Sequence, residues 1–307
     1  MCLRGPPGER GPADLLTFSV VNLDKPPGPS AHQVAAWVRD TVADALGNAG
    51  ASDADRFDRV AHAGTLDPKV TGCLPLLLGD ATRMAQVFDD SRKEYVAVLE
   101  LHGSPPADLR DVIAEFEGPI YQKPPRKSAV VRRLRVRETY ALEVLEVDGR
   151  QVLLQVRCES GTYVRKLCHD LGLALGTGAH MGHLRRTGTD PFDDRDLATL
   201  QDLEDALAWW AEDGDPDPLR GVVSPAERAL GAIPRVTVAP SAAREVAEGA
   251  PVYAPGVIDA EVDGERVSDR PLVVCVTPNG AAVCLGRLVG DPGSGAGTVV
   301  RLERVLV

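Results

Sequence analysis

Asp67 is the residue whose type and setting most suggest chemistry. It stands between a Gly-Thr-Leu lead-in and Pro68 in HAGTLDPKVTGCLPLLLG, where the other residues are mostly small or apolar. An aspartate in a loop most often accepts hydrogen bonds from nearby backbone amides in a turn. A carboxylate beside a dry apolar wall can instead act as a nucleophile or a base. The local pattern alone favours the turn, so the choice depends on the rest of the chain.

Positive charge is concentrated in two places, although the chain as a whole has a net charge of −11. Residues 121–137 (YQKPPRKSAVVRRLRVR) contain no acid, and a second basic pair lies in HLRRTG. In so acidic a chain, an acid-free run of this density favours a phosphate-binding strip over a solvated cationic face. The candidate phosphate-binding residues are Lys123, Arg126, Lys127, Arg132, Arg133, Arg135 and Arg137 in the strip, and Arg185 and Arg186 in the pair.

The overall composition is that of a globular protein. Its 307 residues are 44% hydrophobic, which is enough for one large domain and one small one. No apolar run approaches the roughly 20 residues of a membrane span, and the N-terminus has no signal-peptide core, so we expect a soluble cytoplasmic protein. The acidity has two explanations: it argues against a nucleic-acid partner, or it keeps the surface soluble in concentrated salt.

The six cysteines are scattered along the chain. They form no Cys-x-x-Cys pair and have no histidine at metal spacing, so the sequence predicts buried free thiols in place of a zinc site or a disulfide framework. The cysteines are Cys2, Cys73, Cys158, Cys168, Cys275 and Cys284.

Hydrophobic spacing predicts both helices and strands. Residues 30–47 have one apolar face and a plausible N-cap at Ser30. From Ile233 onward, short apolar runs alternate with turn residues, which predicts a compact all-β module. The other expected elements are strands at 93–101 and 150–160, helices at 107–118 and 161–176, an acidic linker at 212–221, and a helix at 241–249 that precedes the β module.

The chain contains, in order, the motifs VNLDKPPGPSAHQV, HAGTLDPKVTGCLPLLLGDATR, KEYV, YQKPPRKSAVVRRLRVRE, CESGTYVRKLCHDLGLALGTGAHMGHLRRTGTDPF and APSAAREVAEGAPVYAPGVI. With these motifs it resembles the TruB-type pseudouridine synthases from about Leu15 onward. More narrowly, it resembles the archaeal dyskerin-like catalytic subunits of box H/ACA guide-RNA ribonucleoproteins. The resemblance implies an α/β (α+β) fold with a central mixed, mainly antiparallel sheet. It implies an N-terminal extension at 1–16 that packs on a PUA domain, a catalytic domain at 17–230, and the PUA domain, a β-barrel that grips RNA, at 231–307.

The resemblance also assigns roles to three residues. It makes Asp67 the catalytic carboxylate, Arg165 the arginine that pairs with it, and Tyr95 the aromatic that stacks on the uracil. On local pattern alone, Tyr95 favours core packing, and Arg165 fits a solvated helix face equally well. Pseudouridine formation breaks the bond between uracil N1 and the ribose, turns the base and rejoins it through C5. Because no redox change or phosphoryl transfer occurs, we expect no cofactor and no metal.

Further residues are implied as the pocket. Tyr163 would form part of its wall and Leu184 an apolar lid, while Lys25 and Pro26 would buttress the active-site loop. His62 would contact nucleic acid next to that loop. A uridine inside a duplex cannot reach a buried carboxylate, so the target must be flipped out of its stack. The basic strip and pair would then hold RNA phosphates.

Three functions remain open at this stage. In the first, favoured by the PUA architecture and the YQKPPRKSAVVRRLR motif, a guide RNA selects uridines in rRNA or tRNA. The enzyme then works with two small H/ACA accessory proteins and a kink-turn-binding protein of ribosomal type. In the second, it modifies a fixed T-loop uridine of tRNA without a guide. In the third, it is a non-catalytic RNA-binding scaffold, against which the intact Asp67, Tyr95 and Arg165 argue.

The acidic surface generates a first prediction. If it is an adaptation to salt, the thermal midpoint should rise as potassium chloride is increased into the molar range. Activity should rise as well, although salt screens phosphate contacts. A thermal melt across a salt series measures this, and a midpoint that falls steadily with salt would contradict the adaptation.

Overall fold

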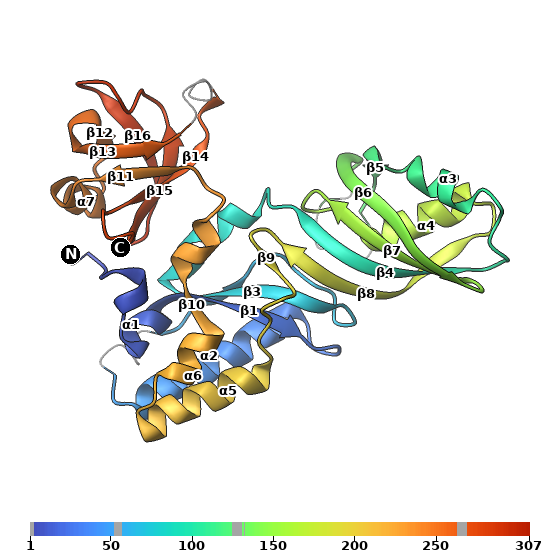
Figure 1. Ribbon diagram of the computed structural model, residues 1–307, viewed down its shortest axis with the longest axis horizontal. Coiled ribbons are helices and arrows are strands. Elements are labelled where there is room, and N and C mark those ends of the chain that lie inside the picture. The colour runs from blue at the N-terminus through green and yellow to red at the C-terminus, as the bar shows by residue number, and fades with distance from the viewer. Residues whose placement is uncertain (1–2, 52–56, 125–130, 132, 263–268) are drawn as a thin grey trace.

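The computed structural model describes residues 3–51, 57–124, 131, 133–262 and 269–307, and these fold into two sheets (Figure 1). The first sheet has ten strands in the order β10-β1-β3-β8-β4-β7-β6-β5, with β2 beside β3 and β9 beside β8. The second has six strands in the order β12-β16-β15-β14-β11-β13. Most strand pairs are antiparallel, so the predicted α/β fold with a mixed, mainly antiparallel central sheet is confirmed.

The strands of the first sheet are β1 (Phe18–Lys25), β2 (Val60–His62), β3 (Thr71–Gly79), β4 (Lys93–Leu101), β5 (Gly118–Gln122), β6 (Arg135–Asp148), β7 (Gln151–Cys158), β8 (Ala179–Thr189), β9 (Phe192–Asp193) and β10 (Val223–Pro225). Those of the second are β11 (Arg235–Val238), β12 (Val252–Tyr253), β13 (Val257–Glu261), β14 (Leu272–Val276), β15 (Ala282–Leu288) and β16 (Thr298–Val305). The α-helices are α1 (Pro12–Thr17), α2 (Ala31–Asn48), α3 (Leu109–Ala114), α4 (Val164–Ala174), α5 (Leu200–Ala208), α6 (Asp217–Val222) and α7 (Pro240–Ala247). Short 3₁₀ segments lie at Pro7–Glu9, Asp80–Phe88, Ala226–Leu230 and Ala254–Gly256, and a π turn lies at Trp209–Asp213.

The first sheet consists of two antiparallel halves joined by one short parallel contact. Strands β3 and β8 pair only at Thr71 with Arg185 and at Gly72 with Arg186. In Figure 1, helices α2, α5 and α6 lie against the half that contains β1 and β3, and α3 and α4 lie against the other half. The segments on either side of this contact therefore meet in the middle of the sheet.

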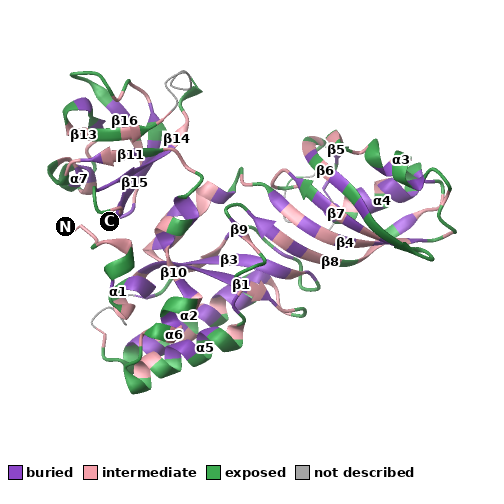
Figure 2. Cartoon of the chain, in the orientation of Figure 1, coloured by how far each residue is buried: buried purple, intermediate pink, exposed green. Residues whose placement is uncertain are grey.

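Local signals explain the elements nearest this contact. Helix α2 begins as predicted, because the Ser30 side chain accepts a hydrogen bond from the Gln33 amide in a capping box. The helix buries Val34, Val38 and Val42. Strand β3 is an almost continuous apolar run and is buried along nearly its whole length (Figure 2). Covered on both faces, β3 is a rigid base for the loop that precedes it.

Three sequence predictions need correction. Helix α4 begins at Val164 and not at residue 161, because Gly161 has a φ of +79° and the Thr162 hydroxyl donates to the Glu159 carbonyl in a turn. Strand β11, with Val236 and Val238 buried, precedes α7, so the β module begins with a strand. The run 212–221 is no linker between the two sheets, because it contains most of α6 and leads into β10 of the first sheet.

The two sheets share a hydrophobic cluster. Phe18 and Leu77 of the first sheet belong to the same buried cluster as Val274 and Leu285 of the second. N-terminal residues add polar contacts across this junction. The buried Arg10 forms two hydrogen bonds, of 2.9 and 2.6 Å, with Glu227, whose carboxylate also accepts from the Ala282 amide. Arg4 Nε donates to the Leu306 carbonyl at 3.3 Å.

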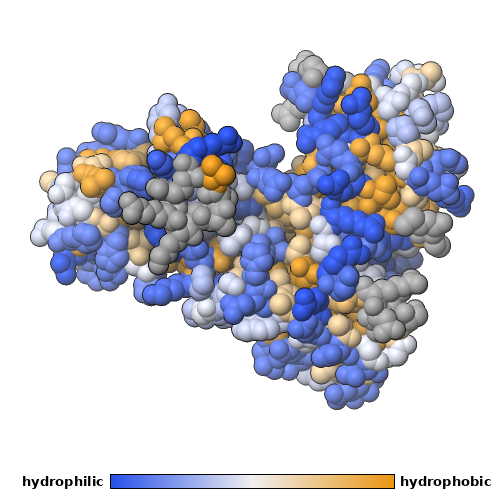
Figure 3. Space-filling view, turned by 180° about the vertical axis from the view of Figure 1, so that it is seen from behind, coloured by the Kyte–Doolittle hydropathy of each residue, from blue (hydrophilic) through white to orange (hydrophobic). Residues whose placement is uncertain are grey.

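Hydrophilic residues take up much of the face seen in Figure 3, as the acidic composition leads one to expect. Within the described ranges, no helix has the length and apolar content that crossing a membrane requires. The cysteines in the same ranges are buried free thiols.

Candidate active site

Asp67 lies in the loop between β2 and β3. The loop is anchored by Leu66, which is 3% exposed, and by a turn in which the Val70 amide donates to the Asp67 carbonyl at 3.0 Å. Gly64 has a φ of +95°, a conformation that glycine adopts readily. The Asp67 side chain itself is 58% exposed. The loop therefore presents a carboxylate to solvent from a firmly packed base.

Lys25 lies beneath this loop at the end of β1 and is fully buried. Its ammonium donates to the carbonyls of Pro68 at 3.1 Å and Val70 at 2.9 Å, on either side of Lys69. It also donates to the carbonyl of Pro26 at 2.9 Å. Burial lowers the pKa of Lys25, and the negative charge of Asp67 opposes this shift. Lys25 thus contacts the loop directly, whereas the half-buried Pro26 accepts a hydrogen bond from Lys25.

Arg165 lies in the first turn of α4 and brings its guanidinium to Asp67 from 98 residues further along the chain. Its Nη2 donates to Oδ2 of the carboxylate. Both side chains are more than half exposed, at 57% and 58%. An ion pair this exposed contributes at most about 1 kcal/mol to folding. The pair therefore adds little stability, and a role of Arg165 in orienting the carboxylate stays a prediction.

Tyr95 lies on β4 and is 8% exposed, within the main hydrophobic cluster. Its neighbours across the sheet are Arg186 on β8 and Val156 on β7. Burial raises the pKa of the Tyr95 phenol, while the charge of Arg186 and a hydrogen bond from it act in the opposite direction. The ring packs in the core, as the strand pattern alone favoured, and stacking on uracil stays a prediction.

Tyr163 is held at the start of α4 by Gln122, a residue that sequence analysis missed. The Tyr163 amide donates to Gln122 Oε1 at 2.9 Å, and its carbonyl accepts from Gln122 Nε2 at 3.2 Å. Gln122 is 2% exposed and belongs to β5. One buried amide side chain thereby fixes the backbone two residues before Arg165. No local sequence signal identifies this contact.

A cleft of about 1160 Å³ opens beside the Asp67–Arg165 pair. Its apolar lining comes mainly from β4 and β8, while Arg165 and the segment after Asp67 line it as well. Leu184 lines this cleft and is half-buried, and its pairing partner on the neighbouring strand β4 is Ala97. The apolar lining residues include Val96, Val98, Met181 and Leu184, and the basic and imidazole ones are Lys69, Arg165, His169, His180, His183 and Arg185.

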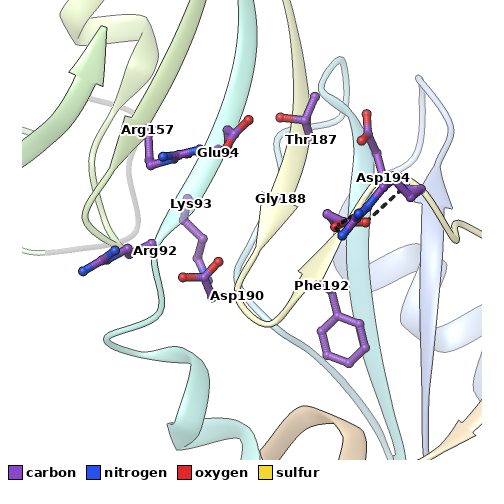
Figure 4. A pocket seen from close by; sticks show the side chains of 11 residues that line it. Arg92, Lys93, Glu94, Arg157, Thr187, Gly188, Asp190, Phe192 and Asp194 are labelled. Atoms are coloured by element: carbon purple, nitrogen blue, oxygen red, sulfur yellow. Dashed lines mark hydrogen bonds and ion pairs between the residues drawn. The ribbon is translucent and has the colours of Figure 1, made fainter. Parts of the chain in front are cut away.

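A smaller pocket of about 380 Å³ lies at the other end of β4, between its first residues and β9 (Figure 4). It is lined by acids and bases together, and Arg165 is not among its lining residues. At its base is the buried Lys93, whose ammonium donates to Ser91 Oγ at 2.6 Å. Burial and the nearby Arg186 charge lower the pKa of Lys93 to about 7. The larger cleft is the better candidate, because it is lined by Arg165, the partner of Asp67, and by the residues that follow Pro68.

The basic pair divides between surface and interior. Arg185 is partly exposed and forms a bidentate ion pair with Asp24 at 2.9 and 3.1 Å. Arg186 is 1% exposed. Its Nε donates to the Cys73 carbonyl at 2.7 Å and its Nη2 to the Gly64 carbonyl at 3.3 Å. The prediction that Arg186 contacts RNA phosphate is wrong, because its guanidinium is buried where β8 meets β3.

The remaining predicted RNA contacts have mixed settings. Lys123 and Arg133 are exposed, whereas Arg135 and Arg137 are half-buried. Arg137 pairs with Glu159 at 2.9 Å. Arg126, Lys127 and Arg132 lie outside the described residues. His62 packs edge-on against His32, with ring centroids 4.6 Å apart, and burial lowers its pKa.

Comparison with known proteins decides the family. Residues 53–108 match the model described as TruB family pseudouridylate synthase (N terminal domain), and residues 165–231 match tRNA pseudouridylate synthase B C-terminal domain. A protein of Halobacterium salinarum described as "Probable tRNA pseudouridine synthase B" is 63% identical over the whole of both chains. A protein of Haloarcula marismortui with the same description is 64% identical, over 100% of this chain and 94% of its own. The chain belongs to the TruB family of pseudouridine synthases.

Solved structures agree over nearly the full length. A chain in "Crystal Structure of a Cbf5-Nop10-Gar1 Complex" aligns with a TM-score of 0.88 and 41% identity, covering 99% of this chain and 90% of that one. A chain in "Structure of H/ACA RNP bound to a substrate RNA containing 2'-deoxyuridine" aligns with a TM-score of 0.87 and 39% identity at the same coverage. This TruB-family chain is an RNA pseudouridine synthase, an isomerase, and its relatives include proteins of halophilic archaea.

Replacing Arg165 tests the orientation of the carboxylate. Arg165→Met should lower the single-turnover rate of pseudouridine formation about 100-fold, because Asp67 loses the cation that fixes it. RNA affinity at fixed salt should change by less than about threefold.

Lys166→Met is the matched control, since it removes the neighbouring ion pair with Asp170 on the same helix. We expect it to leave the rate unchanged. A normal rate in Arg165→Met, or an equal loss in both variants, would contradict the assignment.

Proposed function

We propose that this chain is the catalytic subunit of a guide-RNA H/ACA ribonucleoprotein that converts specific uridines of rRNA or tRNA to pseudouridine. The observation that carries this proposal is its likeness, over 99% of its length, to chains of a Cbf5-Nop10-Gar1 complex and of H/ACA ribonucleoproteins. The Asp67–Arg165 pair at the cleft supports the catalytic part. An intact pair also argues against a non-catalytic scaffold.

The chemistry assigns roles to the residues of the site. Asp67 would act as nucleophile or base while the N1–C1′ bond breaks and the C5–C1′ bond forms. Arg165 would hold the carboxylate, and Tyr95 would stack on the uracil. The proton leaves C5 and N1 gains one, so the isomerisation balances without an external oxidant or reductant. We propose no cofactor and no metal.

The cleft has the chemistry of an RNA site. Its valine, methionine and leucine side chains would pack against the flipped base and its neighbours. Lys69 and Arg185 at the same cleft would contact phosphates, as would Lys123, Arg133 and Arg135 from the strip. Locally positive residues thus allow RNA binding by a chain whose net charge is −11.

The complexes in which similar chains were solved contain Nop10, Gar1 and a substrate RNA, and we propose partners of these kinds for this chain. We also propose a guide RNA and a kink-turn-binding protein of ribosomal type, which the resemblance to guide-RNA enzymes implies. We propose that the second sheet belongs to a PUA domain at 231–307. Residues 17–230 would form the catalytic domain, and residues 1–16 an N-terminal extension that packs on the PUA domain. We also propose that the complex acts in the cytoplasm.

Guide-independent modification of tRNA is the second candidate. It is favoured by the description "Probable tRNA pseudouridine synthase B" that the similar proteins carry. In that case a fixed uridine of the T-loop would be the target. The two candidates share the same cleft and the same carboxylate, so only substrate choice separates them.

A uridine-modification assay at high salt distinguishes the candidates. One T-loop tRNA and one guide-plus-target pair are each incubated with the chain alone and with its accessory proteins. We expect product from the guided pair only when guide and accessory proteins are present. Product from tRNA with the chain alone would instead support the second candidate, and no product in any arm would contradict both.

A further inference from the structure

Arg186 lies where the two halves of the first sheet are joined. On one side of β8 it is paired with Gly72 of β3, and on the other side with Tyr95 of β4. The approach to β3 is very close: a Cβ added at Gly72 would lie 2.2 Å from the Arg186 carbonyl oxygen. Beyond these two residue pairs, β3 and β8 separate. Arg186 therefore occupies the point from which the strands diverge.

The Arg186 side chain reaches both ends of the segment that carries Asp67. Its Nη2 donates to the carbonyl of Gly64, three residues before Asp67, and its Nε to the carbonyl of Cys73, six residues after it. A Cβ added at Gly64 would lie 3.4 Å from Nη1 of the same guanidinium. The start of the loop thus rests directly on Arg186.

Burial of this charge is costly, and the surroundings do little to neutralise it. Within the described residues, no carboxylate forms an ion pair with Arg186. The buried Lys93 adds a second positive charge that interacts with Arg186, and its ammonium lies 3.9 Å from the position of a Gly64 Cβ. A buried cation without a counter-charge destabilises a fold unless its hydrogen bonds compensate. An apolar side chain of similar volume at this position would stabilise the fold at least as well.

We propose that Arg186 is a positioning residue of the isomerase, which fixes the Asp67 segment at Gly64 and Cys73 and holds it against the Tyr95 strand. The proposal rests on the proposed function only in taking Asp67 as the reacting carboxylate. Lys25 holds the middle of the segment through Pro68 and Val70. Arg186 holds its ends. Together they bind four main-chain carbonyls on either side of the exposed Asp67 side chain.

Loop fixation is measured directly by amide hydrogen exchange. In Arg186→Met, exchange of the amides between residues 63 and 73 should accelerate at least about tenfold, because both carbonyl contacts are lost. Arg10→Met is the matched control, since Arg10 is also buried but lies at the junction with the second sheet. Its loss should lower the thermal midpoint to a similar extent and leave exchange of the loop unchanged.

Catalysis is measured with the same two variants, in the full complex with guide and target RNA, well below each thermal midpoint. Arg186→Met should lower the single-turnover rate at saturating RNA about 100-fold, because displacement of about 1 Å is enough for such a loss. RNA affinity should stay within about threefold. Arg10→Met should keep the wild-type rate.

Arg186→Lys is the second variant, and it also serves if the methionine variant does not fold. A single ammonium cannot span both carbonyls as the guanidinium does, so exchange and rate should fall between wild type and Arg186→Met. Loop exchange unchanged in both Arg186 variants would overturn the inference. An inactive wild type with faster loop exchange in the variants would instead contradict the proposed function and leave the positioning role supported.

Discussion

The position of the Asp67 loop depends on buried cations that bind main-chain carbonyls. The ammonium of Lys25 donates hydrogen bonds to the carbonyls of Pro68 and Val70, and the guanidinium of Arg186 donates to those of Gly64 and Cys73. The exposed ion pair between Asp67 and Arg165 is too weak to hold a loop in place. In the site we propose, orientation of the Asp67 carboxylate and fixation of its backbone are separate tasks, carried out by different charged residues.

The topology of the sheet brings these residues together. The Asp67 loop leads into β3, Arg165 belongs to the helix before β8, and β3 and β8 meet in the short parallel contact. Antiparallel pairing on either side of this contact provides two stiff halves, and the apolar residues of β4 and β8 line the cleft beside it. The site consequently lies where segments distant in the sequence meet. Because β3 and β8 diverge there, their main-chain carbonyls need hydrogen bonds from side chains.

Much of this was predictable from the sequence, because the motifs around Asp67, Tyr95 and Arg165 are specific and the apolar patterns of α2 and β3 are clear. The difference in burial between the partly exposed Arg185 and the buried Arg186 was not predictable. Successive residues of a strand point to opposite faces, but the sequence LRRTG does not show which face is enclosed. The contact of Gln122 with Tyr163 joins residues 41 apart and has no local signature. The start of α4 was also missed, since Gly161 and Thr162 form a turn within an otherwise helical pattern.

The central claim is that Asp67 is the reacting carboxylate of an RNA pseudouridine synthase. Release of tritium from target RNA labelled at uracil C5 measures the reaction directly, because hydrogen leaves C5 when the new bond to the ribose forms. Asp67→Asn should lower release at least about 1000-fold with RNA affinity nearly unchanged, while Asp170→Asn on α4 should release tritium as the wild type does. Substantial release by Asp67→Asn, or a parallel loss of RNA binding, would contradict the claim.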